Sequence, residues 1–171
     1  MIRLATLQDL VSILDIVCAC ISMMQKEKNT QWDHTYPSKD DFIKDISDQT
    51  LYVYEYQGEV AGFVCLNEQE AEGYRNVKWE SMNKATIIHR MAVNPNVQRC
   101  GIASALLKFA EQIAVEREHS YIKSDTCSMN EHMKRLFLSK GYRKVGEISH
   151  VGRVETFFCY EKRVSTYQKV K

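Results

Sequence analysis

The segment from Val93 to Ala103 carries the residue types that could hold a phosphate group, and it reads VNPNVQRCGIA. It leads from an apolar run into an apolar repeat with helical spacing that begins at Ile102. The first N–H groups of a helix have no intrahelical partner and lie at the positive end of its dipole, so they attract anions. Small residues at Gly101 and Ala103 would let a ligand approach the backbone. The segment therefore predicts an anion-binding turn.

The same segment excludes two common phosphate chemistries. It contains neither the G-x-G-x-x-G pattern of dinucleotide sites nor the G-K-[ST] ending of P-loops. Hydride transfer and nucleoside triphosphate hydrolysis are therefore unsupported, and a different phosphate ligand is indicated.

Two side chains could accept a proton as a general base. His89 precedes Met91 by two residues in the apolar run 86–93, so strand alternation places both on one face. An unperturbed imidazole has a pKa of about 6.5, which suits proton transfer near neutral pH. Glu80 is the second candidate. Each has a structural alternative: His89 as a core histidine beside Arg90, and Glu80 as a solvated loop carboxylate.

Size and charge restrict the classes of protein. The 171 residues suit one compact domain, and 23 Lys and Arg against 22 Asp and Glu leave a formal charge of +1. Near-neutrality disfavours nucleic acid and membrane surfaces as partners. The apolar stretch 11–24 contains Ser12 and Asp15, so we expect neither a secretion signal nor a membrane span. Six scattered cysteines without a C-x-x-C pair predict reduced thiols in the cytoplasm, and the histidine and cysteine spacing predicts no metal site.

The elements that must position these residues follow a mixed α/β order. We expect strands at 2–5, 51–56, 60–66, 86–93, 121–127, 142–146 and 154–162. We expect helices at 7–21 after Thr6, at 39–46 after Ser38, from 102, and at 133–140 closed by Gly141. The polar segment 67–84 should be an exposed connection with a strand-like piece at 77–79.

Two sequence blocks resemble one family. HRMAVNP at 89–95, followed by Gln98-x-x-Gly101-x-Ala103, resembles the Q/R-x-x-G-x-G/A acyl-CoA signature of the GNAT N-acyltransferase superfamily. Downstream, Asn130, Leu136-Phe137 and Gly141-Tyr142 resemble that superfamily's N-x-x-A-x-x-L-Y-x-x-x-G-F block at the same spacing. The resemblance covers about residues 1–162 and leaves 163–171 as a short basic tail. It implies a single domain whose mixed, mostly antiparallel sheet is split by a V-shaped cofactor opening, with helices on both faces.

The resemblance also implies acetyl-CoA as co-substrate. The backbone at the end of the central strand would bond the pantetheine arm, and the Met91 amide would polarise the thioester carbonyl as an oxyanion hole does. Asn130 would bond the pantetheine or help to open the sheet. The predicted cofactor-binding residues are Met91, Ala92, Val93, Gln98, Arg99, Cys100, Gly101, Ile102, Ala103, Ser104, Asn130 and Phe137.

Three positions depart from the family pattern. Arg99 stands where glycine is frequent, and Met133 where a small residue is usual. Phe137 occupies the position of the tyrosine that in many members protonates the leaving CoA thiolate. A thiolate leaves readily, so the reaction can proceed without a dedicated acid, or with Tyr142 or water as the donor.

The acceptor side needs a neutral amine, because an ammonium has no lone pair to attack a thioester. Members of the family often carry a Glu base on the central strand, where His89 stands here. Four aromatic residues, Trp32, Tyr36, Tyr74 and Trp79, fall in segments that line the family's acceptor pocket, although core packing would explain them equally well.

The resemblance thus implies an N-acetyltransferase that moves an acetyl group directly from acetyl-CoA to a primary amine of a small molecule or peptide. The alternative is an acyl-CoA-binding sensor with little or no turnover. A homodimer is left open.

Overall fold

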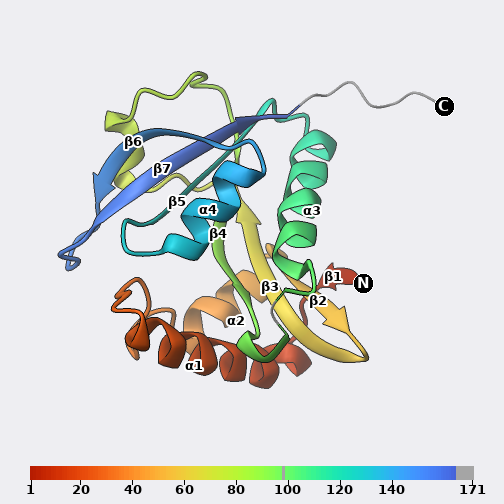
Figure 1. Ribbon diagram of the computed structural model, residues 1–171. Coiled ribbons are helices and arrows are strands. Elements are labelled where there is room, and N and C mark those ends of the chain that lie inside the picture. The colour runs from red at the N-terminus through yellow and green to blue at the C-terminus, as the bar shows by residue number, and fades with distance from the viewer. Residues whose placement is uncertain (98, 165–171) are drawn as a thin grey trace. The chain divides into compact units, whose positions relative to one another are not determined.

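The computed structural model describes residues 1–97 and 99–164 (Figure 1). The chain divides into two compact units, and each is described by itself. Unit 1 comprises 1–66 and 89–107, and unit 2 comprises 67–88 and the chain from 108 onward. Strand β4 (Thr86–Val93) has residues in both units.

Unit 1 begins with a short strand and a long helix. Its elements are β1 (Ile2–Leu4), the 3-10 helix η1 (Leu7–Asp9), α1 (Leu10–Lys26), α2 (Lys39–Ser47), β2 (Leu51–Tyr56), β3 (Glu59–Asn67), the end of β4, and η3 (Pro95–Val97). The strand order is β1-β2-β3-β4, and β2 pairs antiparallel with both β1 and β3. The predicted cap of α2 is confirmed, because the Ser38 hydroxyl accepts the Asp41 N–H at 3.2 Å and the Asp41 carboxylate accepts the Ser38 N–H at 2.7 Å.

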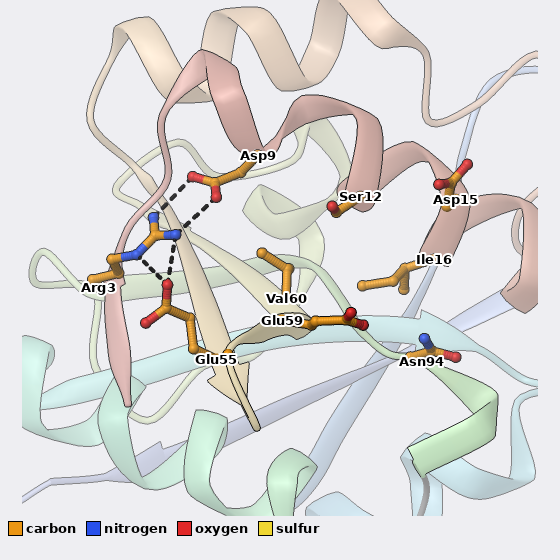
Figure 2. A pocket seen from close by; sticks show the side chains of 10 residues that line it. Arg3, Asp9, Ser12, Asp15, Ile16, Glu55, Glu59, Val60 and Asn94 are labelled. Atoms are coloured by element: carbon orange, nitrogen blue, oxygen red, sulfur yellow. Dashed lines mark hydrogen bonds and ion pairs between the residues drawn. The ribbon is translucent and has the colours of Figure 1, made fainter.

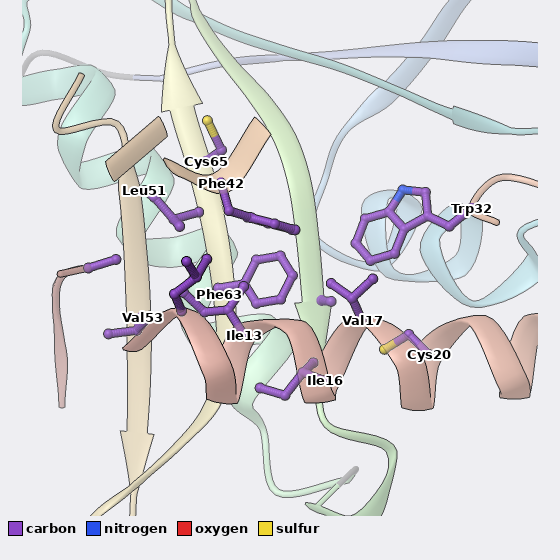
Figure 3. Packing of buried hydrophobic residues seen from close by; sticks show 13 residues of the cluster. Ile13, Ile16, Val17, Cys20, Trp32, Phe42, Leu51, Val53, Phe63 and Cys65 are labelled. Atoms are coloured by element: carbon purple, nitrogen blue, oxygen red, sulfur yellow. The ribbon is translucent and has the colours of Figure 1, made fainter. Parts of the chain in front are cut away.

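One face of α1 is part of the unit 1 core (Figure 3). The stretch Leu7–Lys26 is apolar and long enough to span a membrane by length and composition. In the structure, however, Ile13, Ile16 and Val17 are at most 3% exposed and pack against residues of β2, β3 and α2. The Phe63 ring of β3 lies edge-on to Phe42 of α2, with ring centres 5.3 Å apart. Burial of its apolar face accounts for the composition of this helix.

Unit 2 is built around three long strands. It holds the start of β4, η2 (Glu72–Asn76), β5 (Tyr121–Cys127), α4 (Glu131–Ser139), β6 (Arg143–Ser149) and β7 (Thr156–Arg163), and α3 (Ile102–Glu116) begins in unit 1 and ends here. The order is β4-β5-β7-β6. The β5–β7 and β6–β7 pairs are antiparallel, whereas β4–β5 is parallel. The predicted fold class, a mixed and mostly antiparallel sheet, is confirmed.

The ladder between β4 and β5 is short. It joins Thr86 to Ile122, Ile87 to Lys123 and Ile88 to Ser124. Strand β5 continues beyond Ser124 and stays paired with β7 as far as Cys127. The Ser124 hydroxyl donates to the Ile88 carbonyl at 3.0 Å and closes the last pair. The parallel ladder therefore covers only the first part of β5, and the rest of β5 pairs with β7.

The prediction for the connection 67–84 was wrong in two respects. It contains the 3-10 helix η2, and residues 77–79 do not form a strand. Three of its side chains are buried: Tyr74 is 0% exposed, and Val77 and Trp79 belong to the same unit 2 core cluster. The Trp79 indole N–H donates to the Tyr74 carbonyl at 2.9 Å. Buried aromatic side chains, together with polar contacts such as the hydrogen bond from Lys123 to Glu70, hold this segment in place without strand pairing.

Candidate active site

The end of β4 turns sharply into the segment that precedes α3. The Asn94 N–H donates to the Ala61 carbonyl of β3 at 2.8 Å, and the Asn94 side-chain oxygen accepts the N–H of Asn96 at 3.0 Å. Helix η3 follows. Gln98, a predicted cofactor-binding residue, lies outside the described residues. The strand end predicted at Asn94-Pro95 is confirmed.

Two residues with left-handed backbone lead into α3. Arg99 has φ of 65° and Gly101 has φ of 75°. The Gly101 carbonyl accepts the N–H of Ala105 at 2.9 Å. The N–H groups of residues 102–104 therefore lie in the first turn of the helix, where they have no acceptor within the helix. Arg99, Cys100 and Gly101 are exposed, whereas Ile102 is buried and anchors the helix. A Cβ at Gly101 would meet no atom within 4 Å, so the space before this turn is open to a ligand.

Gly62 on β3 lets the backbones of unit 1 approach closely. A Cβ there would lie 2.8 Å from the Ala92 carbonyl oxygen and 3.3 Å from Ile102 Cγ2. Glycine therefore lets β3 pack directly against the end of β4 and the first residue of α3. Gly62 is not among the predicted site residues, although an isolated glycine inside a strand pattern is a signal of close backbone approach.

The two faces of β4 have different environments. The guanidinium of Arg90 donates to both carboxylate oxygens of Asp45 on α2, at 2.8 and 2.7 Å, and to the Tyr36 hydroxyl at 3.1 Å. The Arg90 and Asp45 side chains are 14% and 6% exposed. Alternation places His89 and Met91 on the opposite face, where both are half-buried.

Glu80, the second base candidate, is held in a network of unit 2. One carboxylate oxygen accepts the Tyr121 hydroxyl at 2.9 Å, and the other binds Arg143. The Tyr121 hydrogen bond, assisted by the positive charge of Arg143, lowers the pKa of the Glu80 carboxyl. A carboxylate with a lowered pKa and both oxygens engaged is a weaker base than a free carboxylate, and the catalytic roles of Glu80 and His89 stay predictions.

The four aromatic residues predicted for the acceptor pocket lie in two separate places. Trp32 is 5% exposed in the unit 1 core, where its ring stacks on Phe63 with centres 6.3 Å apart. Tyr74 and Trp79 are buried in the unit 2 core. Tyr36 alone of the four is half-buried, and its hydroxyl is bonded to Arg90. The acceptor role of these residues stays a prediction.

The downstream block lies in unit 2. The Asn130 side chain accepts the Met133 N–H at 3.1 Å and caps α4, which explains why the helix begins at Glu131, earlier than predicted. Phe137 is fully buried, and its ring centre lies 5.1 Å from that of Tyr142 and 5.0 Å from that of Tyr160. The cofactor-binding roles of Asn130 and Phe137 stay predictions.

Tyr142, one proposed donor for the leaving thiolate, is poorly placed for that task. It is 3% exposed, and its hydroxyl has no hydrogen-bond partner among the described residues. Burial, with the charge of Glu111 as a smaller cause, raises the pKa of this phenol far above its usual value. A buried phenol of raised pKa gives up its proton reluctantly, so Tyr142 is a poor candidate for this donor.

Unit 1 also contains an acidic cavity of about 420 Å³ between the start of α1 and the β2–β3 hairpin (Figure 2). On one side Arg3 donates to both carboxylate oxygens of Asp9 and to Glu55. Asp15 and Glu59 lie elsewhere on its wall. None of the predicted site residues lines it. Within residues 1–97 and 99–164, no group of three or more His, Cys, Asp or Glu side chains is placed to hold a metal ion.

Comparisons with known proteins agree with the resemblance. The family model of the acetyltransferase (GNAT) family matches residues 19–142. A protein from Staphylococcus aureus Mu50 assigned as an acetyltransferase is 28% identical, with 96% of this chain and 99% of that chain covered and a TM-score of 0.75. No curated protein matched in a sequence search.

Two further solved structures share the fold at lower identity. A GNAT-family acetyltransferase from Streptococcus agalactiae 2603 is 22% identical, with 95% and 94% of the two chains covered and a TM-score of 0.85. A ribosomal-protein-alanine N-acetyltransferase from Brucella melitensis is 18% identical, with 95% and 99% covered and a TM-score of 0.67. The family match, which spans most of the chain, identifies this protein as a member of the GNAT acetyltransferase family.

Proposed function

We propose that the protein transfers an acetyl group from acetyl-CoA directly to a primary amine of a small molecule or peptide. The observation that carries this proposal is the turn before α3, where two exposed residues with left-handed backbone, Arg99 and Gly101, lead into the first turn of the helix, and a Cβ on Gly101 would meet no atom within 4 Å. Backbone amides at a helix start suit the two phosphates of a pyrophosphate. Arg99 adds a cation beside them.

In this proposal the end of β4 carries the reacting part of the cofactor. The backbone of Met91, Ala92 and Val93 would bond the pantetheine arm, and the Met91 amide would donate to the thioester oxygen as negative charge develops on it. A hydrogen-bond donor stabilises this developing charge best when its position is already fixed before the reaction. The close packing at Gly62 and the Asn94–Ala61 hydrogen bond support this, because both hold the strand end. Acetyl-CoA supplies the activated acyl group, and the chain supplies position and donors.

The leaving thiolate would be protonated by water. Phe137 has no hydroxyl, and Tyr142 is buried with a raised pKa. A thiol is far more acidic than an alcohol, so the C–S bond can break without a dedicated acid.

We also propose a cytoplasmic location and a soluble amine acceptor, with neither nucleic acid nor membrane as partner. The near-neutral charge and the six free cysteines support this location.

A second candidate function is an acyl-CoA-binding sensor with little or no turnover. Phe137, where many family members carry the proton-donating tyrosine, is the observation that favours it. Both functions require binding of acyl-CoA, but only the transferase would also transfer the acyl group to an amine.

The test combines calorimetry with a thiol-release assay. Acetyl-CoA and CoA should bind, and thiol should be released in the presence of at least one member of a panel of polyamines, aminoglycosides, amino acids and peptide N-termini. Binding without release on any amine would favour the sensor. No binding of either ligand at saturating concentration would overturn both functions.

A further inference from the structure

A buried histidine of unit 2 joins the two ends of the connection 67–84. His119 lies in the turn between α3 and β5 and is 6% exposed. Its Nδ1 lies 2.9 Å from the hydroxyl oxygen of Thr86, the first residue of β4, and its Nε2 lies 3.5 Å from Glu68 Oε1. Lys84 Nζ donates to Glu68 Oε2 at 3.2 Å. Glu68 and Lys84 stand at opposite ends of the connection, so this cluster, which lies wholly within unit 2, closes its base.

The middle of the connection is held on β5 by polar contacts. Tyr121, Lys123 and Asp125 alternate along β5 and therefore share one face of the strand. Each binds a side chain of the connection, and the pairs are Tyr121–Glu80 at 2.9 Å, Lys123–Glu70 at 2.6 Å and Asp125–Tyr74 at 2.6 Å. A segment fixed by such contacts and by few apolar side chains can open locally at a lower free energy than global unfolding.

The Glu68 carboxylate selects one tautomer of neutral His119. A carboxylate only accepts hydrogen bonds, so Nε2, which faces Glu68, carries the hydrogen and Nδ1 keeps a lone pair. The Thr86 hydroxyl therefore donates to Nδ1. Thr86 is 0% exposed, so Nδ1 takes the place of water as the acceptor for its hydroxyl hydrogen. The neutral imidazole thus satisfies this buried hydroxyl.

Protonation of His119 breaks this arrangement. An imidazolium carries a hydrogen on both ring nitrogens, so Nδ1 becomes a donor and the Thr86 hydroxyl loses its acceptor. A buried polar hydrogen that loses its acceptor costs free energy. The Glu68 carboxylate attracts the imidazolium, but it is 44% exposed and already paired with Lys84, so solvent and a competing cation weaken this attraction.

The charges that face His119 do not offset its burial. Burial is the largest effect and lowers the pKa of the imidazole below its usual value. Glu68 raises this pKa, whereas Arg117 in the same turn and Lys84 lower it. The closed segment therefore resists protonation at a pH where an imidazole in the open segment accepts a proton. Stability of the closed form is complete above about pH 6.5 and is lost as the pH falls below that value.

We propose that His119 is an acid-sensitive clamp, whose protonation releases the two ends of the connection 67–84 and lets this segment open locally. The opening would uncover the polar face of β5 while the strands of unit 2 remain paired. The inference concerns unit 2 alone and is independent of the acetyl transfer proposed above.

The test is amide hydrogen exchange of the full chain at pH 7 and pH 5.5, corrected for the intrinsic effect of pH on exchange. We expect the opening constant of amides in the connection to rise about 3- to 10-fold at the lower pH, because one proton changes an equilibrium by at most about 10-fold per pH unit. Amides of β7 serve as the internal reference and should show no such rise.

Three variants isolate the role of the histidine. His119→Gln keeps a donor and an acceptor but does not titrate, so its opening constants at the two pH values should agree within about 2-fold. His132→Gln, at an exposed histidine of α4, is the matched control and should keep the wild-type rise. Glu68→Gln removes the charge that favours the imidazolium, so the closed form resists protonation more strongly and the rise should exceed that of the wild type.

The outcomes that overturn the clamp are distinct. No rise in the wild type would overturn it, and so would a wild-type rise in His119→Gln shown to be folded by circular dichroism. If His119→Gln does not fold, Glu68→Gln decides the matter: a larger rise than in the wild type supports the clamp, and an equal or smaller rise overturns it.

Discussion

Gly62 and Ala92 are in such close contact that a side chain on residue 62 would begin 2.8 Å from the Ala92 carbonyl oxygen. The crowded atom is backbone, so it cannot rotate away. We expect Gly62→Ala to lower the free energy of unfolding by about 1–3 kcal/mol and to weaken acetyl-CoA binding, because β4 must shift. Chemical denaturation and calorimetry would measure both. Gly58→Asn is the control: a Cβ on residue 58 would meet no atom within 4 Å, and Asn tolerates the left-handed backbone there. A Gly62→Ala protein as stable as wild type would contradict the prediction.

Gly101→Glu should abolish cofactor binding while leaving the protein folded. The new carboxylate would occupy the open space before α3 and repel the pyrophosphate, so we expect affinity for CoA to fall at least about 100-fold. Gly101→Asn provides the control, because it tolerates φ of 75° without adding charge and should retain measurable binding. Calorimetry with CoA distinguishes the two variants. Equal affinities would show that the turn does not hold the phosphates.

Removing one partner of the buried Arg90–Asp45 pair should be costly. Arg90→Leu leaves the Asp45 carboxylate, 6% exposed, without its guanidinium, so we expect a loss of about 3–5 kcal/mol in the free energy of unfolding. The exposed pair Lys44–Asp48 on the same helix is the control, and Lys44→Ala should cause no measurable change. Urea denaturation of both variants gives the comparison. A cost for Arg90→Leu no greater than that of Lys44→Ala would refute the buried-pair argument.

Asp9 should make stability depend on pH in the acid range. The hydrogen bond from Arg3, opposed by burial and assisted by Thr6, lowers the pKa of the Asp9 carboxyl from 3.8 to about 2. The unfolded chain therefore takes up this proton at higher pH than the native state does, so stability is lost as the pH falls from about 4 to about 2. Asp9→Asn should flatten that part of the stability–pH curve. Asp15→Asn, in the same cavity wall, should leave it steep, and a steep curve in Asp9→Asn would contradict the assignment.

Tyr142→Phe should stabilise the protein. The substitution removes a buried hydroxyl that has no partner among the described residues, and we expect a gain of about 1 kcal/mol in the free energy of unfolding. Tyr74→Phe removes a hydroxyl bonded to Asp125 and should have the opposite sign. Thermal denaturation would compare the two. A large fall in the rate of thiol release by Tyr142→Phe would instead show that this phenol delivers the proton to CoA.

Local signals in the sequence predicted where two elements of unit 1 begin or end. Ser38 with Asp41 three residues later predicts a capped helix, and Asn94-Pro95 ends β4, because both signals act through their own backbone. The connection 67–84 was mispredicted because its buried positions are set by partners elsewhere in the chain. Val77, for example, packs against Gly146 of β6, where an added Cβ would lie 2.8 Å from Val77 Cγ1. No local pattern reveals such a partner.

The same reason explains why the sequence could not predict a group of hydrogen-bonded side chains in unit 2. Tyr74, Asp125 and His150 are 51 and 25 residues apart along the chain, and no spacing rule connects them. His89 is predicted as a base because strand alternation places it on the face of Met91, and Glu80 because it follows the strand-like piece at 77–79. Proximity in sequence to a motif identifies candidates, whereas the hydrogen bonds of each candidate decide what it can do.

The buried aromatic anchors of 67–84 have a consequence for engineering the protein. Tolerance to substitution in this stretch follows side-chain burial, so a combinatorial library should vary Glu72 and Arg75 on the solvent side and leave Tyr74 and Trp79 fixed. Replacing the whole segment with a shorter linker would remove part of the unit 2 core together with one of the two partners of Asp125. A stretch that reads as a spacer is thus a structural support, and a graft there would change the protein's interior.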